Sequence, residues 1–331
     1  MNHYSIGIDI GGTNTVVGLV RDDGLVSKRL SLPTQEYTTT PAYISAMDEA
    51  IRTLMQEQNI PHIESIGIGA PNSNFYEGCI EEGTVNLPIK ERIPLKELMG
   101  SRFGVPVVVD NDANAAAIGE LVYGGGRGMR HLITMTLGTG IGSGIVVDGK
   151  IVHGHTGTAG ELGHCIVNPN GRMCGCGRQG CIEMYASARG ICQNYLEAAA
   201  QAGAPLSESA MQTLTCQQVG EAAAKGDPIA CKAYDTTAYW LGIALANAAN
   251  FSAPEAIFLM GGPTRAGEAL MTPLRKYFEQ FLLFIYKGKI SVQLSHLNSN
   301  DTAILGSAAL GKISEEHFYT ILPYSSFNRL R

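Results

Sequence analysis

The feature that most constrains this chain is a group of one histidine and three cysteines within eighteen residues. His164 is followed by Cys174, Cys176 and Cys181, and glycines lie between the cysteines. One imidazole and three thiolates form a common closed tetrahedral shell for zinc, and glycines allow a short loop to turn tightly around one ion. The spacing therefore predicts a structural zinc site. The alternative interpretation is three buried thiols beside an unrelated histidine.

Two carboxylates, Glu161 and Glu183, flank this cluster without belonging to its set of soft ligands. Their positions suggest that the metal loop holds polar groups in place for another purpose.

The run from Gly175 to Gly180 also matches the G-x-G-x-x-G dinucleotide fingerprint. Because this run follows no expected strand and opens no apolar helix, it does not indicate a dinucleotide site.

Composition limits the class of protein and its partners. The chain has 331 residues and a net charge of −6 without a basic run, so nucleic acid is not an expected partner. No apolar run approaches the length of a membrane span, and the first residues do not resemble a secretory signal. The other five cysteines are scattered, which favours free thiols in a reducing cytoplasm. We therefore expect a cytoplasmic globular protein with no membrane contact.

A pattern of strand, glycine turn and returning strand occurs twice. Strands expected over 4–10 and 15–20 flank Gly11, Gly12 and Thr13, and strands over 132–137 and 144–147 flank Gly138, Thr139 and Gly140. Such turns expose backbone amides that suit phosphate oxygens, and Asp9 is placed to face a metal ion accompanying a nucleotide. Either turn alone is also open to interpretation as a simple tight turn. The duplication favours two lobes of like fold that each offer one turn to phosphates.

Polar residues also follow three further expected strands. Strand 63–70 leads to Asn72, strand 105–110 leads to Asn111 and Asp112, and strand 256–260 leads to Gly261 and Gly262. The carboxyl ends of strands are where α/β proteins bind ligands. For Asn111 and Asp112, a helix N-cap is the alternative interpretation. In the helix expected over 302–312, Gly306 and Gly311 nearly match a P-loop, but we interpret them as packing glycines.

Together these motifs resemble the ROK family (repressors, uncharacterised reading frames and kinases), in its bacterial glucokinase-like branch. The resemblance covers roughly residues 4–312, and its motifs are Asp9-Ile-Gly-Gly-Thr13, Asn111-Asp112-Ala-Asn114, Leu137-Gly-Thr-Gly-Ile-Gly142, Glu161-Leu-Gly-His164 and Cys174-x-Cys176-Gly-x-x-Gly-Cys181-x-Glu183. It implies an α/β fold of two actin-like, ribonuclease-H-like lobes around a central cleft, with a zinc-binding loop. We expect one lobe from residues 1–120 and about 305–331, and a second from 121–304 that carries the zinc loop and a dimer interface.

The resemblance also implies an activity, an ATP-dependent hexose kinase with glucose as the expected acceptor and Mg²⁺ accompanying ATP. Asp112 is then the general base, and the implied sugar-binding residues are Asn72, Asn111, Asp112, Glu161, His164 and Glu183. The implied ATP-binding residues are Asp9, Gly11, Gly12, Thr13, Gly138, Thr139, Gly140, Gly261 and Gly262. His164, Cys174, Cys176 and Cys181 are the implied zinc ligands, with the second ring nitrogen of His164 facing the sugar. The resemblance to the family also suggests that the protein forms a homodimer.

Other functions within the family remain open at this point. The first alternative is a kinase for another hexose, such as N-acetylmannosamine, allose or fructose. The second is a sugar-responsive regulator without catalysis. Repressors of the family carry a DNA-binding segment ahead of the first strand, whereas here the first strand is expected from Tyr4.

Overall fold

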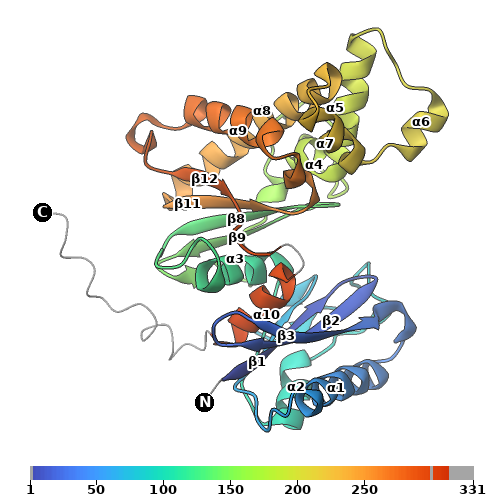
Figure 1. Cartoon of the computed structure of the whole chain (residues 1–331), viewed down its shortest axis with the longest axis vertical. Helices are drawn as coiled ribbons and strands as arrows, with labels where there is room; N and C mark the ends of the chain where they lie inside the picture. Colours follow the sequence, from blue (N-terminus) through green and yellow to red (C-terminus); the bar gives the residue numbers. More distant parts are fainter. Residues whose placement is uncertain (1–2, 299–300, 313–331) are drawn as a thin grey trace, which may run out of the picture. The chain divides into compact units, whose positions relative to one another are not determined.

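The computed structural model describes residues 3–298 and 301–312. Contacts divide the chain into two compact units, which are described separately below (Figure 1). Unit 1 comprises Met1–Arg130, Asp148–Ala159 and His296–Arg331, and unit 2 comprises His131–Val147 and Gly160–Ser295. None of the helices within the described part of the chain is long and apolar enough to cross a membrane.

These bounds differ from the two lobes expected from the sequence in three segments. Residues 121–130, 148–159, 296–298 and 301–304 belong to the second lobe expected from the sequence, but their contacts place them in unit 1. The helix α3 (Asp112–Tyr123) carries the chain past residue 120, and β10 (Lys150–Ile151) contacts this helix. The part of the predicted first lobe from residue 313 onward lies outside the described residues.

Unit 1 is built on a five-stranded sheet with the order β3-β2-β1-β4-β7. Its strands are β1 (Tyr4–Ile10), β2 (Asn14–Arg21), β3 (Val26–Pro33), β4 (Ile66–Gly69) and β7 (Val107–Asp110). β1 to β3 pair antiparallel, and β1, β4 and β7 are parallel. The helices α1 (Thr40–Glu57) and α2 (Leu95–Phe103) cover one face, and α10 (Thr302–Lys312) covers the other (Figure 1). The short strands β5 (Ser73–Asn74) and β6 (Cys79–Ile80) form a separate hairpin.

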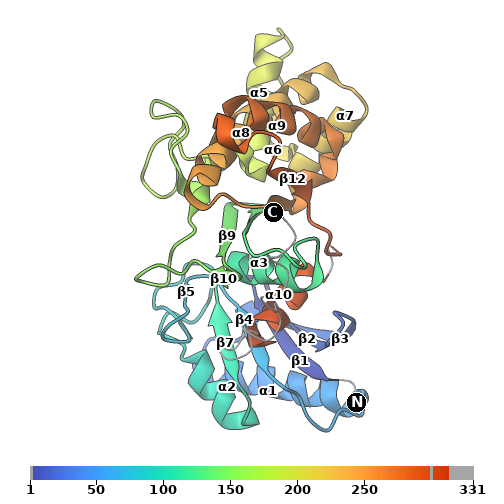
Figure 2. The ribbon, with the colours of Figure 1, turned by 90° about the vertical axis from the view of Figure 1, so that its left-hand side faces the viewer.

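Glycines allow α10 to lie very close to the sheet and to α3. A Cβ atom on Gly67 of β4 would overlap the backbone of Ser307 and lie 2.8 Å from the Gly311 nitrogen. A Cβ atom on Gly119 of α3 would lie 2.8 Å from the Gly306 Cα atom. Figure 2 shows α3 and α10 side by side. Gly306 and Gly311 are therefore packing glycines, as the sequence predicts, and they help to fix the position of α3.

We expect Gly67→Ala to lower the free energy of unfolding by about 2–3 kcal/mol, because the new methyl group forces α10 away from the sheet. Gly100→Ala is the matched control, since a Cβ atom there meets only a Val107 methyl group at 3.8 Å. Within helix α2 this change should stabilise the protein by roughly 0.5–1 kcal/mol. Urea denaturation of both variants measures the difference. Equal stability of the two variants would show that α10 does not pack as closely as described.

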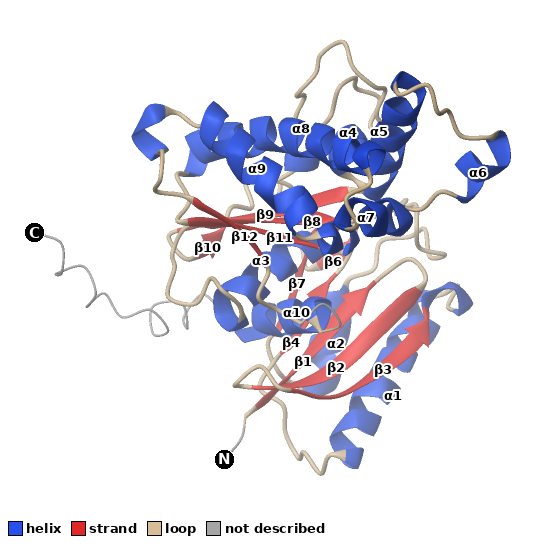
Figure 3. Ribbon diagram, turned by 45° about the horizontal axis from the view of Figure 1, so that its top comes forward, coloured by secondary structure: helices blue, strands red, loops and turns tan. Residues whose placement is uncertain are grey.

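Unit 2 repeats the strand arrangement of unit 1. Its strands β8 (Leu132–Leu137), β9 (Ile141–Val147), β11 (Ala256–Met260) and β12 (Ser291–Leu294) lie in the order β9-β8-β11-β12. β8 pairs antiparallel with β9 and parallel with β11, as β1 does with β2 and β4. The helices above one face of this sheet (Figure 3) are α4 (Glu183–Ala186), α5 (Ala188–Gln201), α7 (Cys216–Ala224), α8 (Pro228–Ser252) and α9 (Glu268–Phe281). The predicted duplication of an α/β unit is confirmed.

Candidate active site and metal cluster

In unit 1, the carboxyl ends of three parallel strands meet at one edge of the sheet. Asp9 of β1 pairs with Gly69 of β4, and Gly69 pairs with Asp110 of β7. A Cβ atom on Gly69 would lie 3.3 Å from the Ala115 Cβ atom, which is a tight contact, so the absence of a side chain leaves room for the first turn of α3. This edge therefore brings together Asp9, Asp110 and Asp112.

Asn111 and Asp112 form the N-terminus of α3. The Oδ1 atom of Asn111 accepts a hydrogen bond from the Ala113 nitrogen at 2.9 Å, so Asn111 is the N-cap. Asp112 is the first helical residue, and its Oδ1 atom accepts from the same nitrogen at 2.8 Å. The N-cap interpretation thus holds for Asn111, while the Asp112 side chain stays accessible to solvent. Desolvation by the surrounding protein raises the pKa of Asp112, and the backbone amide of Ala113 opposes this shift.

Asp9 lies close enough to Asp112 for the two carboxylates to interact. Desolvation by burial, followed by repulsion from Asp112, raises the pKa of Asp9 from 3.8 to about 6. Two neighbouring carboxylates without a cation are unfavourable, and a bound divalent cation relieves such repulsion. The pair is therefore suited to a ligand that brings positive charge.

We expect Asp9→Asn to stabilise the substrate-free protein by roughly 1–3 kcal/mol at pH 7.5. Because Asp9 is partly exposed, we expect a value near the lower end of this range. Because its pKa is raised on folding, Asp9 costs nothing below pH 3.8, and its penalty grows as the pH rises through about 6. The gain should therefore disappear at pH 4. Asp48→Asn in α1 is the control, at a half-buried surface carboxylate that pairs with Arg52, and it is expected to change stability by less than about 1 kcal/mol. A gain of equal size at both pH values would contradict this explanation.

The turn formed by Gly11, Gly12 and Thr13 connects β1 to β2. The Gly11 nitrogen donates to the Asn14 carbonyl at 2.9 Å, and the Thr34 nitrogen donates to the Thr13 carbonyl at 3.0 Å. The side-chain amide of Gln35 donates to the carbonyls of Gly12 and Asn86. These bonds use the amide of Gly11 and the carbonyl groups of Gly12 and Thr13, and they hold the turn in one conformation.

Asn72 stands in a loop of unit 1 with a positive φ of 50°. Its Nδ2 atom donates to Thr84 Oγ1 at 3.1 Å, and its carbonyl accepts from the Glu81 nitrogen at 3.0 Å. Its amide group is thus engaged within its own loop. The role of Asn72 toward a sugar remains a prediction.

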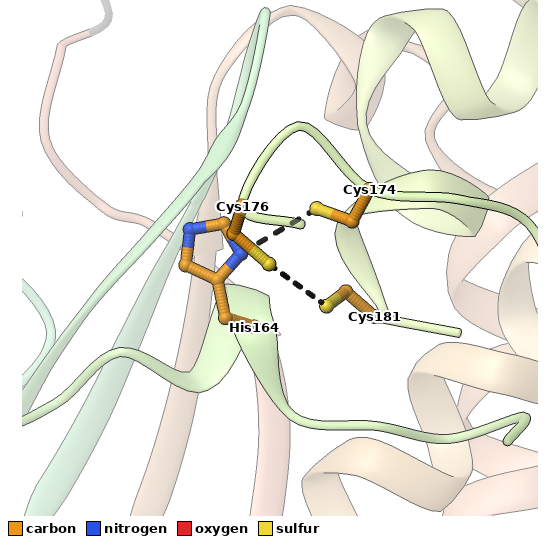
Figure 4. Close-up of side chains that lie close together, drawn as sticks. All are labelled: His164, Cys174, Cys176 and Cys181. Carbon is orange, nitrogen blue, oxygen red and sulfur yellow. Dashed lines mark hydrogen bonds between the residues drawn. The ribbon is translucent and has the colours of Figure 1, made fainter. Parts of the chain in front are cut away.

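In unit 2, the four predicted metal ligands lie together (Figure 4). One ligand atom from each of His164, Cys174, Cys176 and Cys181 falls within 4.8 Å of all the others. The Nδ1 atom of His164 is 3.7 Å from Cys174 Sγ, and Cys176 Sγ is 3.6 Å from Cys181 Sγ. A tetrahedral zinc ion with Zn–S bonds of about 2.3 Å places its sulfur atoms about 3.8 Å apart. The donor set and its spacing therefore fit zinc, and the sulfur separation is far longer than the roughly 2.05 Å of a disulfide.

The loop that carries these ligands depends on glycines with positive φ. Gly177 has a φ of 83° and Gly180 a φ of 85°, where L-residues are strained. The Cys174 nitrogen donates to the Arg178 carbonyl at 2.8 Å, which closes the turn around Cys176. Burial raises the pKa of the Cys174 and Cys181 thiols, while hydrogen bonds from Arg178 lower that of Cys176. These thiols must lose their protons when a metal ion binds.

The two flanking glutamates differ in their surroundings. Glu161 precedes the 3-10 turn Leu162–His164, and its side chain is exposed. The Oε2 atom of Glu183 accepts from the Ile141 nitrogen at 3.0 Å, and its Oε1 atom is 3.7 Å from Cys174 Sγ. Glu183 therefore connects the metal cluster to the first residue after the turn of Gly138, Thr139 and Gly140.

A pocket of about 340 Å³ lies beside the same glycine turn in unit 2. Small and apolar residues dominate its wall, with a few polar groups; the lining residues are Gly138, Thr139, Ala188, Cys216, Gln217, Gly220, Glu221, Ala224, Tyr234, Gly262, Pro263, Arg265 and Ala266. Pockets for small ligands have this size and this mixture. Of the predicted nucleotide-binding residues of unit 2, Gly138, Thr139 and Gly262 line the pocket, whereas Gly140 and Gly261 do not.

Sequence reasoning missed two groups of residues at these sites. The first is α7, which supplies much of the pocket wall but carries no recognisable motif. The second is the pair of the buried Asp110 and the half-buried His153 beside Asp112, with Asp110 Oδ2 and His153 Nε2 2.7 Å apart. The position of Asp110 directly before Asn111 is a sequence feature that could have indicated its role. No feature of the sequence indicates that His153 is its partner.

Comparison with known proteins agrees with this geometry. The model of the ROK family matches residues 5–313. The chain is 34% identical to a glucokinase of Streptomyces coelicolor over 93% of this chain and 97% of that protein. It is 35% identical to a glucokinase of Thermotoga maritima, over 93% and 96%.

A solved structure gives the same result. A ROK family glucokinase from Streptomyces griseus, in complex with glucose and AMPPNP, superposes with a TM-score of 0.74 and 32% identity, covering 94% of this chain and all of that one. The predicted actin-like, ribonuclease-H-like fold class is confirmed for the two units. On this evidence, the chain belongs to the ROK family.

Proposed function

We propose that this protein is an ATP-dependent glucokinase, which transfers the γ-phosphoryl group of ATP to a hydroxyl group of glucose. The observation that carries the proposal is the similarity, over nearly the whole chain, to a glucokinase solved with glucose and AMPPNP. The glucokinases of two further organisms support it at 34% and 35% identity. The residues described above supply the groups that this reaction needs.

Asp112 is the proposed general base. Its carboxylate takes the proton of the attacking hydroxyl while the hydroxyl oxygen forms a bond to the γ-phosphorus, and the bond to the β–γ bridging oxygen breaks to release ADP. The raised pKa makes Asp112 a stronger base than an ordinary carboxylate. The Oδ1 atom of Asn111 is occupied by capping α3, so its Nδ2 group is the proposed donor to the sugar. Asn72 is a further proposed sugar contact.

The zinc loop of unit 2 is the proposed scaffold for the remaining sugar contacts. When bound, zinc closes a four-ligand shell and so acts by holding the loop together. The Nδ1 atom of His164 faces the sulfur atoms, which leaves Nε2 as the proposed donor to a sugar hydroxyl. Glu161 and Glu183 are the proposed acceptors of sugar hydroxyl protons. Glu183 is already oriented by its bond to the Ile141 nitrogen.

The two glycine turns and the unit 2 pocket are the proposed nucleotide contacts. The pocket lined by Ala188, Gly220 and Tyr234 suits a flat, mostly apolar adenine ring. Gly12, Thr13, Thr139 and Gly140 are proposed to offer backbone amides to the phosphates. The amides of Gly11 and Gly138 donate within their own turns, so these two residues are proposed to lie against the phosphates without donating to them. Asp9 is proposed to face the Mg²⁺ ion that accompanies ATP. Gly261 is proposed to lie against the adenosine together with Gly262.

A homodimer and a cytoplasmic location also remain proposals.

A coupled ADP-release assay with purified protein and a panel of sugars tests the function. The panel contains glucose, N-acetylmannosamine, allose, fructose and a no-sugar control. We expect the highest kcat/KM for glucose and only slow ATP hydrolysis without sugar, because correct substrates complete the catalytic site. Preference for another hexose would change the assigned substrate, and no sugar-dependent ADP release at all would contradict kinase activity.

A further inference from the structure

Asp110 is a buried carboxylate next to the proposed base. The residue is 1% exposed, and its carboxylate receives three hydrogen bonds. The Oδ1 atom accepts from the Asn111 nitrogen at 2.7 Å and from Asn114 Nδ2 at 2.9 Å. The Oδ2 atom accepts from His153 Nε2 at 2.7 Å. Two of these donors belong to the N-terminal turn of α3, so Asp110 holds the residues on either side of Asp112.

His153 comes from a different part of unit 1. It lies in the segment Asp148–Ala159, which interrupts unit 2 in the sequence but contacts unit 1. Its ring stacks on Phe75 with the centroids 3.7 Å apart, and the hydroxyl group of Tyr76 donates to the Gly154 carbonyl at 2.7 Å. The ring is therefore fixed on one side by an aromatic face and on the other by a carboxylate.

The contacts of Asp110 and His153 hold together three stretches of chain that lie next to residues of the proposed reaction. Asp110 leads directly to Asn111 and Asp112, and Phe75 and Tyr76 follow Asn72 in its loop. The segment that carries His153 ends at Ala159, two residues before Glu161. A buried carboxylate needs hydrogen-bond donors. Without the hydrogen bond from His153, the Asp110 side chain would therefore shift or accept a hydrogen bond from another donor.

We propose that Asp110 and His153 are positioning residues for phosphoryl transfer. The His153 Nε2–H group donates to Asp110 Oδ2, which leaves Oδ1 to hold the Asn111 amide and the Asn114 side chain. These hydrogen bonds keep the start of α3 in the orientation that directs the Asp112 carboxylate toward the attacking hydroxyl group. This inference rests on the proposed function, because it concerns the geometry of the base in that reaction. A misplacement of about 1 Å at such a base can cost about 100-fold in rate.

Two substitutions of His153 separate the hydrogen bond from the ring packing. His153→Gln keeps an N–H donor at about the same reach but loses the ring, whereas His153→Phe keeps a ring against Phe75 but loses the donor. We expect His153→Phe to lower kcat for glucose about 100-fold with an unchanged KM for ATP, and His153→Gln to stay within about fivefold of the native protein. His155→Phe is the matched control, an exposed histidine in the same segment, and it should stay within about twofold. Equal losses in the Phe and Gln variants, or native activity in His153→Phe, would overturn the proposal.

Hydrogen exchange provides a readout that does not depend on activity. In the substrate-free protein, the peptide that covers residues 107–116 should exchange at least about tenfold faster in His153→Phe than in His153→Gln, because the turn of α3 loses its support. Should the native protein phosphorylate no sugar, the proposed function fails, and this comparison still decides whether His153 holds the turn. Unchanged exchange in His153→Phe would contradict the positioning role. If His153→Phe does not fold, the double variant Asp110→Asn with His153→Phe removes the buried charge, and native activity in it would overturn the proposal.

Discussion

Asp112→Asn is expected to lower kcat for glucose phosphorylation by about 10²–10⁴-fold, the usual contribution of a positioned general base. Asparagine has nearly the same shape as aspartate and can also accept the hydrogen bond from the Ala113 nitrogen. It cannot take a proton from a sugar hydroxyl. Glucose should therefore still bind, with an affinity within a few-fold of the native protein by isothermal titration calorimetry.

Asp227→Asn is the matched control for this substitution. Asp227 is the N-cap of α8, and its Oδ1 atom accepts from the Ala230 nitrogen at 2.8 Å. Asparagine caps a helix as well as aspartate does, so this variant should keep native activity. A loss of only a few-fold in Asp112→Asn would show that another group removes the proton. A parallel loss of glucose affinity would instead indicate that Asp112 mainly binds the sugar.

Cys176→Ala is expected to remove zinc from the protein and to weaken glucose binding by at least about 100-fold. Three remaining ligands bind zinc far less well, and a structural zinc site contributes on the order of 10 kcal/mol to the order of its loop. Without the ion, Glu161, His164 and Glu183 lose their common support. Atomic absorption measures the zinc content, and calorimetry measures the affinity for glucose.

Cys165→Ala is the control for the metal site. Cys165 is an exposed free cysteine directly after His164, and it does not belong to the cluster of four ligands. This variant should keep its zinc and its affinity for glucose. If Cys176→Ala lost the metal but bound glucose normally, the loop would not be the scaffold of the sugar site.

The features that sequence predicts best are those encoded by neighbouring residues. The four metal ligands lie within eighteen positions, so their spacing alone restricts the loop to a conformation that can surround one ion. The two glycine turns are likewise local, and their repetition predicts the two related sheets of units 1 and 2. Asn111 and Asp112 were recognised as a strand-to-helix junction, although the sequence left open which of them caps the helix.

The features that sequence does not predict arise from contacts between distant positions. Asp110 and His153 are 43 positions apart in the sequence. Their hydrogen bond could not be predicted, because nothing near His153 distinguishes it from a surface histidine. The wall formed by α7 consists of alanine, glycine and polar residues that would suit any helix. The predicted lobe bounds differ from the unit bounds for the same reason, since the segment Asp148–Ala159 follows a strand of unit 2 and yet contacts unit 1.

The most direct test is a crystal structure of the protein grown with glucose, with anomalous data collected on either side of the zinc absorption edge. We predict a zinc ion bound by His164, Cys174, Cys176 and Cys181, and a glucose hydroxyl within hydrogen-bond distance, about 2.6–3.2 Å, of the Asp112 carboxylate. A site without zinc at these four residues, or glucose bound away from Asp112, would contradict the account.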